Sequence, residues 1–330
     1  MQQIPMLRNS ERKDFKRCPQ RWWWSWREGL NKQGPPNDKL WFGEGIHLAL
    51  ALWYIPGMKR GVDPRKTWRK FAKDDIKFIR TEYAKEYDPA KYEDAATFGE
   101  ELLTNYLDHW GRDRSWDVIA PEQRFEALVP DRNGKPVVRL FGTFDGVYRD
   151  LNDGNRPKLM EHKTAAAIYT GHLELDEQGG TYVTVATHTC RDQGLIGENE
   201  TIEEITYNFL RKGKKDDRPT NEKGQSLNKD GTISKTQPSP LFVRLPITRS
   251  RAEQGTQLRR IAEEVESMND FRRGDRELWK NPTRDCSWDC DFYEMCLLHE
   301  SSPDDADEFK SMVFRVQNPY AEHLRKTAAT

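Results

Sequence analysis

The sequence predicts an α/β protein with strands in the middle of the chain and helices on either side. Three observations lead to this prediction. Aromatic residues recur at helical spacing before residue 110, strand-like segments separated by turns begin near Phe125, and residues 248–274 repeat apolar side chains on one helical face. We therefore expect a helical region over 1–115, a sheet-bearing core over 116–247, and a helix with a C-terminal tail over 248–330.

In the helical region, two groups of large apolar side chains recur every three or four residues, which is typical of one buried helix face. We expect all of them in the core. They are Trp68, Phe71 and Phe78, followed by Phe98, Leu102, Tyr106 and Trp110.

The middle of the chain predicts a three-stranded meander, formed by FEALV, VVRLFGTFDGVYRD and KLMEHKTA with the turns DRNGKP and LNDGNRP between them. Residues 176–189 predict a helix, and EEITYNFLRKG after it predicts another strand. The segment Arg211 to Pro240 lacks apolar periodicity, so we expect an exposed excursion in which Thr232 to Ser234 is a short strand at most.

Composition limits the classes of function. The chain has 330 residues, 35% hydrophobic and 32% charged, with 11 Trp, 11 Tyr and 14 Phe. That is enough apolar bulk for a substantial core, so disorder throughout is excluded. The 53 basic residues almost balance the 54 acidic ones. No general cationic field is available for polyanions, so any nucleic-acid site must be local.

The chain shows no membrane helix, because its longest mainly apolar stretch, Ile46 to Ile55, is about half the roughly 20 residues that a bilayer requires. The polar N-terminus lacks a secretory signal, so we expect a cytoplasmic protein. Five cysteines in that reducing compartment point to metal ligation or burial rather than disulfides.

Acidic and basic residues meet in the predicted meander. Strand alternation sends Glu161 and Lys163 to one face and His162 to the other, and the hairpin brings Asp145 close. Carboxylates buried together require neutralisation, which Mg²⁺ or Mn²⁺ supplies. Such an ion could activate water while Lys163 orients or deprotonates it, which is phosphodiester hydrolysis chemistry. Taken alone, the pattern fits an ordinary ion pair on a solvated strand better.

Four motifs in order change that balance: FGEGIH, GTFDG, EHK and EQGGTY. With them the sequence resembles the RecB-like branch of the PD-(D/E)XK nuclease superfamily, from about Ser10 to Cys296. The resemblance implies a restriction-endonuclease-like core, in which helices flank a mixed central sheet. It also implies that the metal ligands are His47, Asp145, Glu161 and the carbonyl of His162, and that Lys163, Gln178 and Tyr182 serve the attacking water and the scissile strand.

Two of these assignments have alternatives. His47 alone fits a satisfied helix histidine, and Tyr182 alone fits a core residue. Gln178 and Tyr182 are four residues apart, so in a helix they share a face. In PEQRFEALV, Glu122 is a better-aligned accessory acid than Glu126.

A cysteine cluster follows the predicted core. Cys286, Cys290 and Cys296 have C-x3-C-x5-C spacing, and Cys18 is the natural fourth ligand. Zinc sites favour paired short knuckles, which this spacing does not match. The arrangement resembles the iron–sulfur subgroup of the same family, including CRISPR-associated members, which implies a [4Fe–4S] cluster. The alternative is that these thiols are incidental. Cys190 matches no ligand pattern, and we expect it in the core.

The resemblance implies a metal-dependent DNA exonuclease acting on DNA ends or single strands, in recombination or repair in a bacterium or bacteriophage. Basic residues around Trp22, Trp23, Trp24 and Trp26 suit contact with single-stranded ends, although we expect at least two of these tryptophans to be packed. The chain lacks a G-x-x-x-x-G-K-[ST] motif, so unwinding would need a helicase partner, and a recombinase or annealing protein is a plausible co-worker. The sequence does not fix the oligomeric state.

Two other readings remain open. One is a non-catalytic iron–sulfur scaffold that binds DNA ends, against which intact Asp145, Glu161 and Lys163 argue. The other is a sequence-specific endonuclease like the restriction enzymes. His47 and the Q-x-x-x-Y motif favour end processing over that second reading.

Overall fold

The computed structural model describes residues 4–321. The described chain forms two compact units, each assembled from segments that are distant in sequence. Unit 1 contains residues 4–35, 126–142 and 258–321, and unit 2 contains Pro36–Phe125 and Thr143–Gln257. Two strands and one long helix pass from one unit to the other. The division into three regions predicted from the sequence remains a hypothesis about functional organisation.

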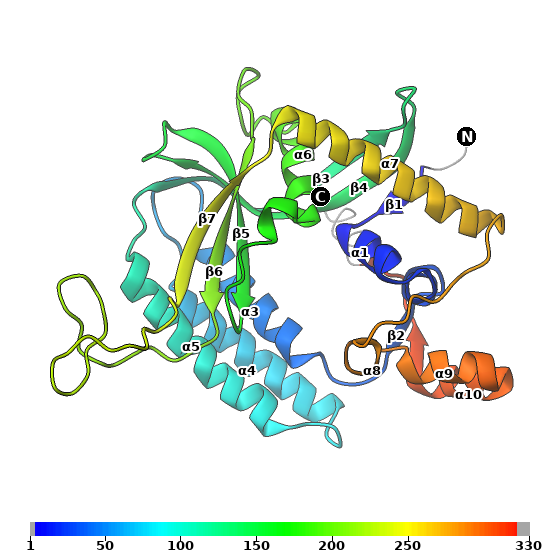
Figure 1. Ribbon diagram of the computed structural model, residues 1–330, viewed down its shortest axis with the longest axis horizontal. Coiled ribbons are helices and arrows are strands. Elements are labelled where there is room, and N and C mark those ends of the chain that lie inside the picture. The colour runs from blue at the N-terminus through cyan, green and yellow to red at the C-terminus, as the bar shows by residue number, and fades with distance from the viewer. Residues whose placement is uncertain (1–3, 322–330) are drawn as a thin grey trace. The chain divides into compact units, whose positions relative to one another are not determined.

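A mixed six-stranded sheet is formed by β1 near the N-terminus and by five strands from the middle of the chain (Figure 1). Its order is β1-β4-β5-β6-β7, and β3 pairs with β4. β4 is antiparallel to β5, β5 is parallel to β6, and β6 is antiparallel to β7. This confirms the α/β class and the meander. The strands are β1 (Met6–Leu7), β3 (Trp116–Pro130), β4 (Pro136–Asp150), β5 (Arg156–Ala165), β6 (Glu204–Arg211) and β7 (Phe242–Thr248).

The parallel pair β5–β6 requires a crossover, which is provided by the short 3-10 turn Leu173–Leu175 and helix α6 (Glu177–Asp192). Helix α6 begins where the Asp176 carboxylate accepts a hydrogen bond from the backbone of Gly179 at 2.9 Å. The predicted order of helix and strand is therefore confirmed. The crossover links the end of β5 to α6, and both carry predicted site residues.

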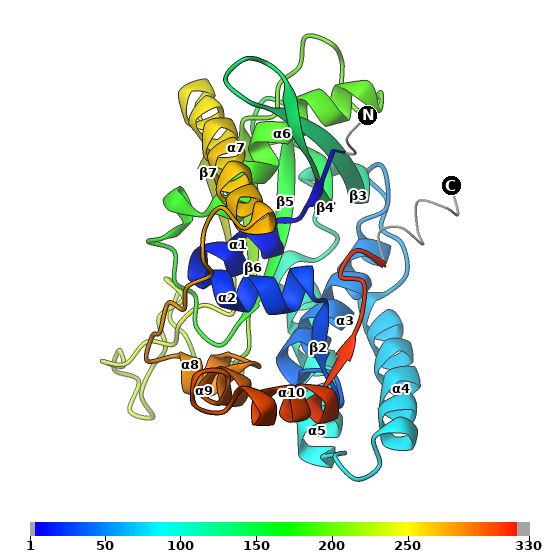
Figure 2. The same cartoon turned by 90° about the vertical axis from the view of Figure 1, so that its right-hand side faces the viewer.

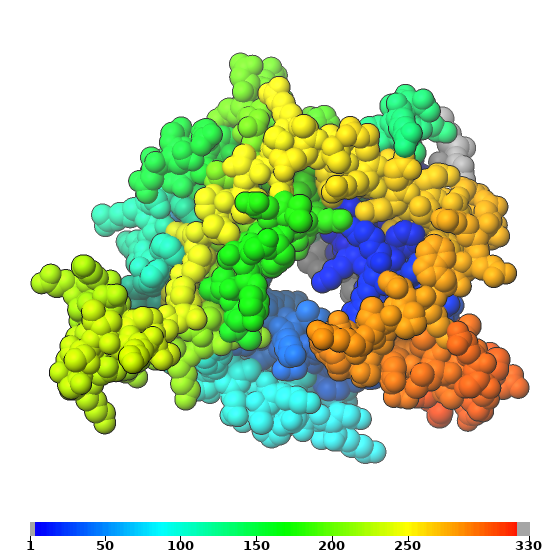
Figure 3. Space-filling view, viewed as in Figure 1, coloured from blue at the N-terminus to red at the C-terminus, as the bar shows by residue number. Residues whose placement is uncertain are grey.

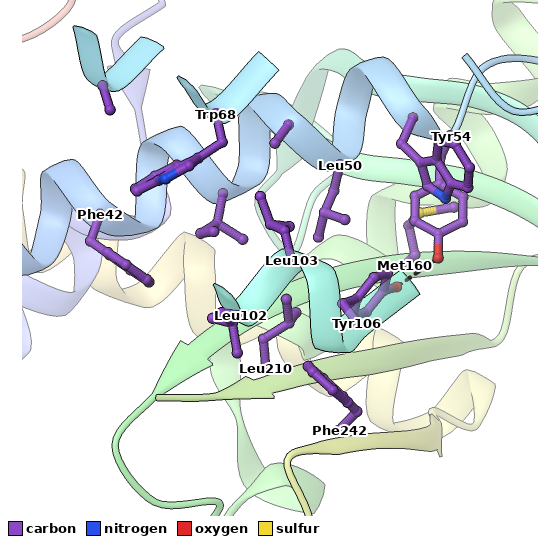
Figure 4. Packing of buried hydrophobic residues seen from close by; sticks show 14 of the residues in the cluster. Phe42, Leu50, Tyr54, Trp68, Leu102, Leu103, Tyr106, Met160, Leu210 and Phe242 are labelled. Carbon is purple, nitrogen blue, oxygen red and sulfur yellow. Dashed lines mark hydrogen bonds between the residues drawn. The ribbon is translucent and has the colours of Figure 1, made fainter. Parts of the chain in front are cut away.

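Three further helices of unit 2 surround a large apolar core. They are α3 (Asp38–Trp53), α4 (Pro64–Glu82) and α5 (Pro89–Trp110), each beginning after an Asn or Asp cap. Figure 4 shows Phe42 and Leu50 of α3 meeting Leu102 and Leu103 of α5. Burying such side chains contributes roughly 1.5–3 kcal/mol each, which fixes α3 in place.

One predicted core residue is wrong: the Phe78 side chain is 56% exposed. Its neighbour Ile79 is 1% exposed and occupies the inward position of α4 below Trp68 and Ala72. Successive residues in a helix are rotated by about 100°, so Phe78 turns away from that face. The other six predicted residues contribute to the core or pack against it.

Unit 1 has small helices and a two-stranded ribbon in which β2 pairs antiparallel with β8 (Figure 2). Trp22 and Trp24 are buried, which confirms that at least two of the tryptophans are packed. The Arg12 guanidinium is buried beside Glu264, with Nε 2.6 Å from Oε2. The elements are α1 (Asn9–Arg17), α2 (Pro19–Trp22), the π-helix Trp23–Arg27, β2 (Leu30–Lys32), α8 (Cys286–Asp289), α9 (Tyr293–Ser301), α10 (Pro303–Val313) and β8 (Phe314–Val316).

Helix α7 (Arg251–Arg273) matches the helix predicted over residues 248–274. Of the four apolar residues predicted on one face, Ile261, Val265 and Met268 are buried and Leu258 is half-buried. The excursion between β6 and β7 stands out as a separate lobe (Figure 3) and is mostly exposed. It has isolated bridges rather than a strand, one of them joining Leu227 and Ile233. Among the helices of residues 4–321, none is long and apolar enough to cross a membrane.

Candidate active site

Strand β5 presents Glu161 and Lys163 on one face, as its alternation requires. Glu161 is only 3% exposed, and its Oε1 accepts a hydrogen bond from Lys163 Nζ at 2.6 Å. Burial of Lys163 alone would lower its pKa, but the Glu161 charge and hydrogen bond raise the pKa above its ordinary value. Lys163 is therefore an ammonium group in this arrangement.

Asp145 approaches β5 where the strand pairing stops. The ladder between β4 and β5 runs from Asp150–Arg156 to Gly146–Met160. One residue further on, the backbone N–H of His162 donates to Asp145 Oδ2 at 2.6 Å instead of to a strand carbonyl. The end of the ladder thus brings the Asp145 carboxylate to the backbone of the E-x-K strand.

Electrostatics separate the two acids. Burial, followed by the Asp145 charge, raises the pKa of Glu161 to about 7. For Asp145, burial opposes ionisation, but the neighbouring His47 charge and hydrogen bond bring its pKa below the ordinary value. The two carboxylates therefore lie close together and differ in proton affinity.

Helix α3 supplies the predicted histidine. His47 Nδ1 lies 3.3 Å from Asp145 Oδ1. Burial alone would lower the His47 pKa, but the charge and hydrogen bond of Asp145 outweigh it and raise the pKa to about 9. Before any cation binds, a protonated imidazole therefore neutralises part of the negative charge.

Glu122 joins this pair from β3. One ligand atom each of His47, Glu122 and Asp145 lies within 4.8 Å of the others. Glu122 has φ 45°, which is uncommon for a residue with a side chain and occurs preferentially at functional sites. Glu126 belongs to the part of β3 in unit 1 and has an oxygen 3.8 Å from Arg139. The preference for Glu122 over Glu126 is thus supported by position.

The burial pattern of β3 shows the same irregularity. Before Glu122 the buried residues of β3 have even numbers, and after it they have odd numbers. Such a one-residue change of phase is typical of a β-bulge. The buried residues are Trp116, Val118 and Ala120, then Phe125, Ala127 and Val129.

Helix α6 brings Gln178 and Tyr182 to the same place. Gln178 Oε1 accepts from Lys163 Nζ at 3.0 Å, and its Nε2 donates to Glu161 Oε1 at 3.0 Å. The same Nε2 lies 3.2 Å from the Tyr182 hydroxyl, and the Tyr182 ring packs edge-on against Phe125 and Phe144. The predicted helical face therefore reaches the predicted strand residues.

Two residues that the sequence did not identify hold α6 against the sheet. The Asp176 carboxylate caps α6 and accepts a hydrogen bond from the Tyr207 hydroxyl of β6 at 2.6 Å. A Cβ on Gly179 would lie 2.0 Å from that hydroxyl oxygen, so this close approach requires glycine. The D-x-x-G pattern before α6 could have indicated the cap, but nothing in the sequence relates Tyr207 to it.

The donor set fits a hard divalent cation. Glu161 Oε2 is buried without a hydrogen-bond partner in the described part of the chain, so an oxygen ligand remains to be satisfied. Carboxylates with one imidazole suit Mn²⁺ or Mg²⁺. The three residues whose ligand atoms lie closest together are His47, Glu122 and Asp145. The predicted set had Glu161 in place of Glu122, and Glu161 lies beside this group. His162 takes part through its backbone, and its imidazole belongs to the opposite face of β5.

The predicted cysteine ligands all lie in unit 1. Backbone amides of Asn281 and Thr283 donate to the sulfurs of Cys18 and Cys286 at 3.4 and 3.3 Å. Burial raises the pKa of Cys296, and the nearby thiols Cys18 and Cys290 add to that rise. Within residues 4–321, no three cysteine sulfurs lie within 4.8 Å of one another.

The fifth cysteine, Cys190, differs from the other four in its burial. Cys190 is fully buried in α6, and burial raises the pKa of its thiol to about 12. It is a core residue, as the sequence predicted.

Comparison with known proteins gives one family. The model of the PD-(D/E)XK nuclease superfamily matches residues 9–297. No curated protein matches the chain significantly in sequence. The chain is similar to the crystal structure of a "Putative exonuclease" from Eubacterium rectale, at 8% identity and a TM-score of 0.42, covering 87% of this chain and 94% of that one. At this level of similarity the match does not bear on function.

Proposed function

The chain belongs to the PD-(D/E)XK nuclease superfamily, and from that premise we propose that it is a divalent-metal-dependent DNA exonuclease of the RecB-like branch. The observation that carries the proposal is the convergence of Glu161, Lys163 and Gln178 in one hydrogen-bonded group beside Asp145. An isolated ion pair on a solvated strand would not bury Glu161 to 3% exposure.

In the proposed mechanism, His47, Glu122, Asp145 and Glu161 would hold the cation, with the His162 carbonyl as a further ligand. When bound, the ion would supply Lewis-acid stabilisation of the phosphodiester and lower the pKa of a water molecule. Lys163 is charged in the metal-free site, so it would donate hydrogen bonds to the attacking water or to a phosphate oxygen and offset negative charge.

Gln178 and Tyr182 keep this lysine in place. Gln178 binds both Lys163 and Glu161, so it fixes the distance between the ammonium and the carboxylate. Tyr182 supports Gln178 from the next turn of α6. Their role is therefore to orient Lys163 toward the scissile strand.

The substrate of the proposed enzyme is DNA with a free end. His47 and the Q-x-x-x-Y motif are the features that the family resemblance associates with end processing rather than site-specific cutting. Recombination or repair would use this activity, with a helicase, recombinase or annealing protein as partner.

The test uses anaerobically purified protein with end-labelled linear and closed circular DNA, both single- and double-stranded, and Mn²⁺ or Mg²⁺. Linear DNA is expected to shorten progressively while circles survive, and Lys163→Ala and Glu161→Gln are expected to abolish shortening. Lys85→Ala removes an exposed lysine elsewhere in unit 2 and is the control. Binding without cleavage in either metal would favour an end-binding scaffold, and cut circles would indicate an endonuclease.

We further propose that Cys18, Cys286, Cys290 and Cys296 hold a [4Fe–4S] cluster. The support for this proposal is the C-x3-C-x5-C spacing with Cys18, which paired zinc knuckles do not match, and the resemblance to the iron–sulfur subgroup. Backbone amides that donate to two of the sulfurs would also favour thiolate ligands. A brown protein absorbing near roughly 400 nm, with iron and sulfide, is expected; a colourless protein with stoichiometric zinc would refute the cluster.

A further inference from the structure

Behind the candidate metal site, on the opposite face of β5, lies a buried polar network centred on Arg244 of β7. Its guanidinium lies between two indole rings, 3.6 Å from the centroid of Trp116 and 3.8 Å from that of Trp110. Nη1 and Nη2 donate to the two Asp113 oxygens at 2.9 and 2.5 Å. Burying a charge in this way is costly unless it is fully paired, so the pair calls for an explanation.

The network reaches helix α3 and helix α5 through two tyrosines. Arg244 Nη2 also donates to the hydroxyls of Tyr54 and Tyr106, at 2.9 and 3.2 Å. Those hydroxyls share a hydrogen bond of 2.6 Å, drawn in Figure 4, and Tyr54 donates to Asp113 Oδ2 at 2.8 Å. Arg244 therefore ties the helix that carries His47 to the sheet.

The network reaches β5 through Asn208. Arg244 Nε donates to Asn208 Oδ1 at 3.3 Å, and Asn208 Nδ2 lies 2.9 Å from His162 Nδ1. Asn208 is fully buried and its other amide hydrogen goes to Tyr106. Because arginine can only donate, the amide oxygen must face Arg244 and the amide nitrogen must face His162.

This orientation fixes the proton on the imidazole. His162 Nδ1 must accept from Asn208, so a neutral His162 carries its hydrogen on Nε2. Nε2 is buried and has no partner within the described residues. An imidazole without these contacts would not adopt a tautomer that leaves a buried N–H without an acceptor. The hydrogen bond from Asn208 therefore imposes the Nε2–H tautomer on His162.

His162 also lies between the two metal-binding elements. Its backbone N–H donates to Asp145, and its ring is edge-on to His47 of α3 and stacked on Tyr54, the residue that follows α3. A shift of the His162 ring would therefore move both the backbone contact to Asp145 and the surface on which His47 packs.

We propose that Arg244 and Asp113 are positioning residues for the metal site, acting through Asn208 and His162 on Asp145 and through Tyr54 on the helix that carries His47. The proposal rests on the metal site of the proposed function. Neither Arg244 nor Asp113 is among the proposed metal ligands. Their contribution is to hold ligands from α3 and from the sheet at a fixed separation before the ion arrives.

Two buried tyrosines provide a matched test. Tyr54 and Tyr148 are each 1% exposed, both rings pack on Trp116, and both hydroxyls are hydrogen-bonded, but Tyr148 bonds to Thr206. Mn²⁺ affinity is measured without DNA by calorimetry, and stability by chemical denaturation. Tyr54→Phe is expected to weaken Mn²⁺ binding about tenfold. Tyr148→Phe should reduce stability to a similar extent and leave Mn²⁺ affinity unchanged.

A second measurement follows the imidazole directly. Ring ¹⁵N shifts of His162 in the metal-free protein should report the Nε2–H tautomer, and Asn208→Asp, which can only accept, should move the proton to Nδ1. Unchanged Mn²⁺ affinity in Tyr54→Phe, or an Nδ1–H tautomer in the wild type, would overturn the positioning role alone. A wild-type protein that binds no Mn²⁺ would overturn the proposed function, and this proposal with it.

Discussion

The candidate metal site and the cysteine segment differ in how their ligands are held. In unit 2, Glu161, Lys163 and Gln178 belong to a strand and a helix and already bond to one another. In unit 1, Cys18 follows a helix and the other three cysteines of the proposed cluster lie in a segment of short helices, all partly exposed. The first site is organised by the fold, whereas the second would depend on the proposed cluster for its organisation.

The comparison predicts that substitutions in the candidate metal site lower the cleavage rate, whereas substitutions in the cysteine segment lower the free energy of unfolding. The largest effect is expected for Lys163→Ala. Loss of its ammonium should lower the DNA cleavage rate about 100- to 1,000-fold, as for other electrostatic donors. Steady-state cleavage assays measure it, and the exposed Lys85→Ala variant should keep wild-type rates. Near-normal cleavage by Lys163→Ala would remove the lysine from the mechanism.

The corresponding change in the cysteine segment is Cys286→Ser. Loss of a cluster ligand should cost more than about 4 kcal/mol of unfolding free energy. Thermal denaturation under anaerobic conditions measures this, with Ser287→Ala, an exposed neighbour, as control. Mn²⁺ affinity should stay near the wild-type value. Equal loss of Mn²⁺ binding would show that the two sites are not independent.

A third change tests how closely the fold organises the metal site. Gly179→Ala places a methyl group against the buried Tyr207 hydroxyl and should cost about 1–3 kcal/mol, with slower cleavage because α6 carries Gln178. Gly180→Ala is the matched control, because its nearest neighbour is 3.8 Å away. Helix propensity makes that change neutral or stabilising by up to about 1 kcal/mol. Equal effects of the two substitutions would contradict the close approach.

The smallest effect is a pH dependence of cation binding. His47 has a pKa raised to about 9 in the folded, metal-free protein. Its protonation therefore stabilises the fold fully below about pH 6.5, and this contribution is lost as the pH rises through about 9. A cation requires the neutral imidazole, so Mn²⁺ affinity should rise by up to about tenfold per pH unit between roughly pH 7.5 and 9. Calorimetric titrations of wild type and His47→Gln test this, and the variant should lose the dependence.

Much of the site was predictable because it depends on local spacing. Strand alternation placed Glu161 and Lys163 together, and helical spacing placed Gln178 beside Tyr182. The position of Glu122 was also indicated, although its positive φ was not. These pairs lie close in sequence, so short-range rules bring their members together. The roles of His47, Glu122 and Gln178 in one site followed from the family resemblance and not from spacing.

The rest depends on packing between distant segments. Tyr207, Asn208 and Arg244 come from β6 and β7, and only the sheet register places Tyr207 against α6 and the other two behind β5. No pattern in the sequence distinguishes them from ordinary strand residues. Phe78 shows the related failure within a helix, where spacing alone could not tell which of two adjacent apolar residues faces the core.

The central claim is that His47, Asp145 and Glu161 share one divalent cation. The most direct measurement is anomalous X-ray diffraction from crystals soaked in Mn²⁺. The account predicts an anomalous peak within coordinating distance of a carboxylate oxygen of Asp145 and of Glu161 and a ring nitrogen of His47. A well-occupied peak elsewhere with these side chains unligated, or no peak at saturating Mn²⁺, would contradict it.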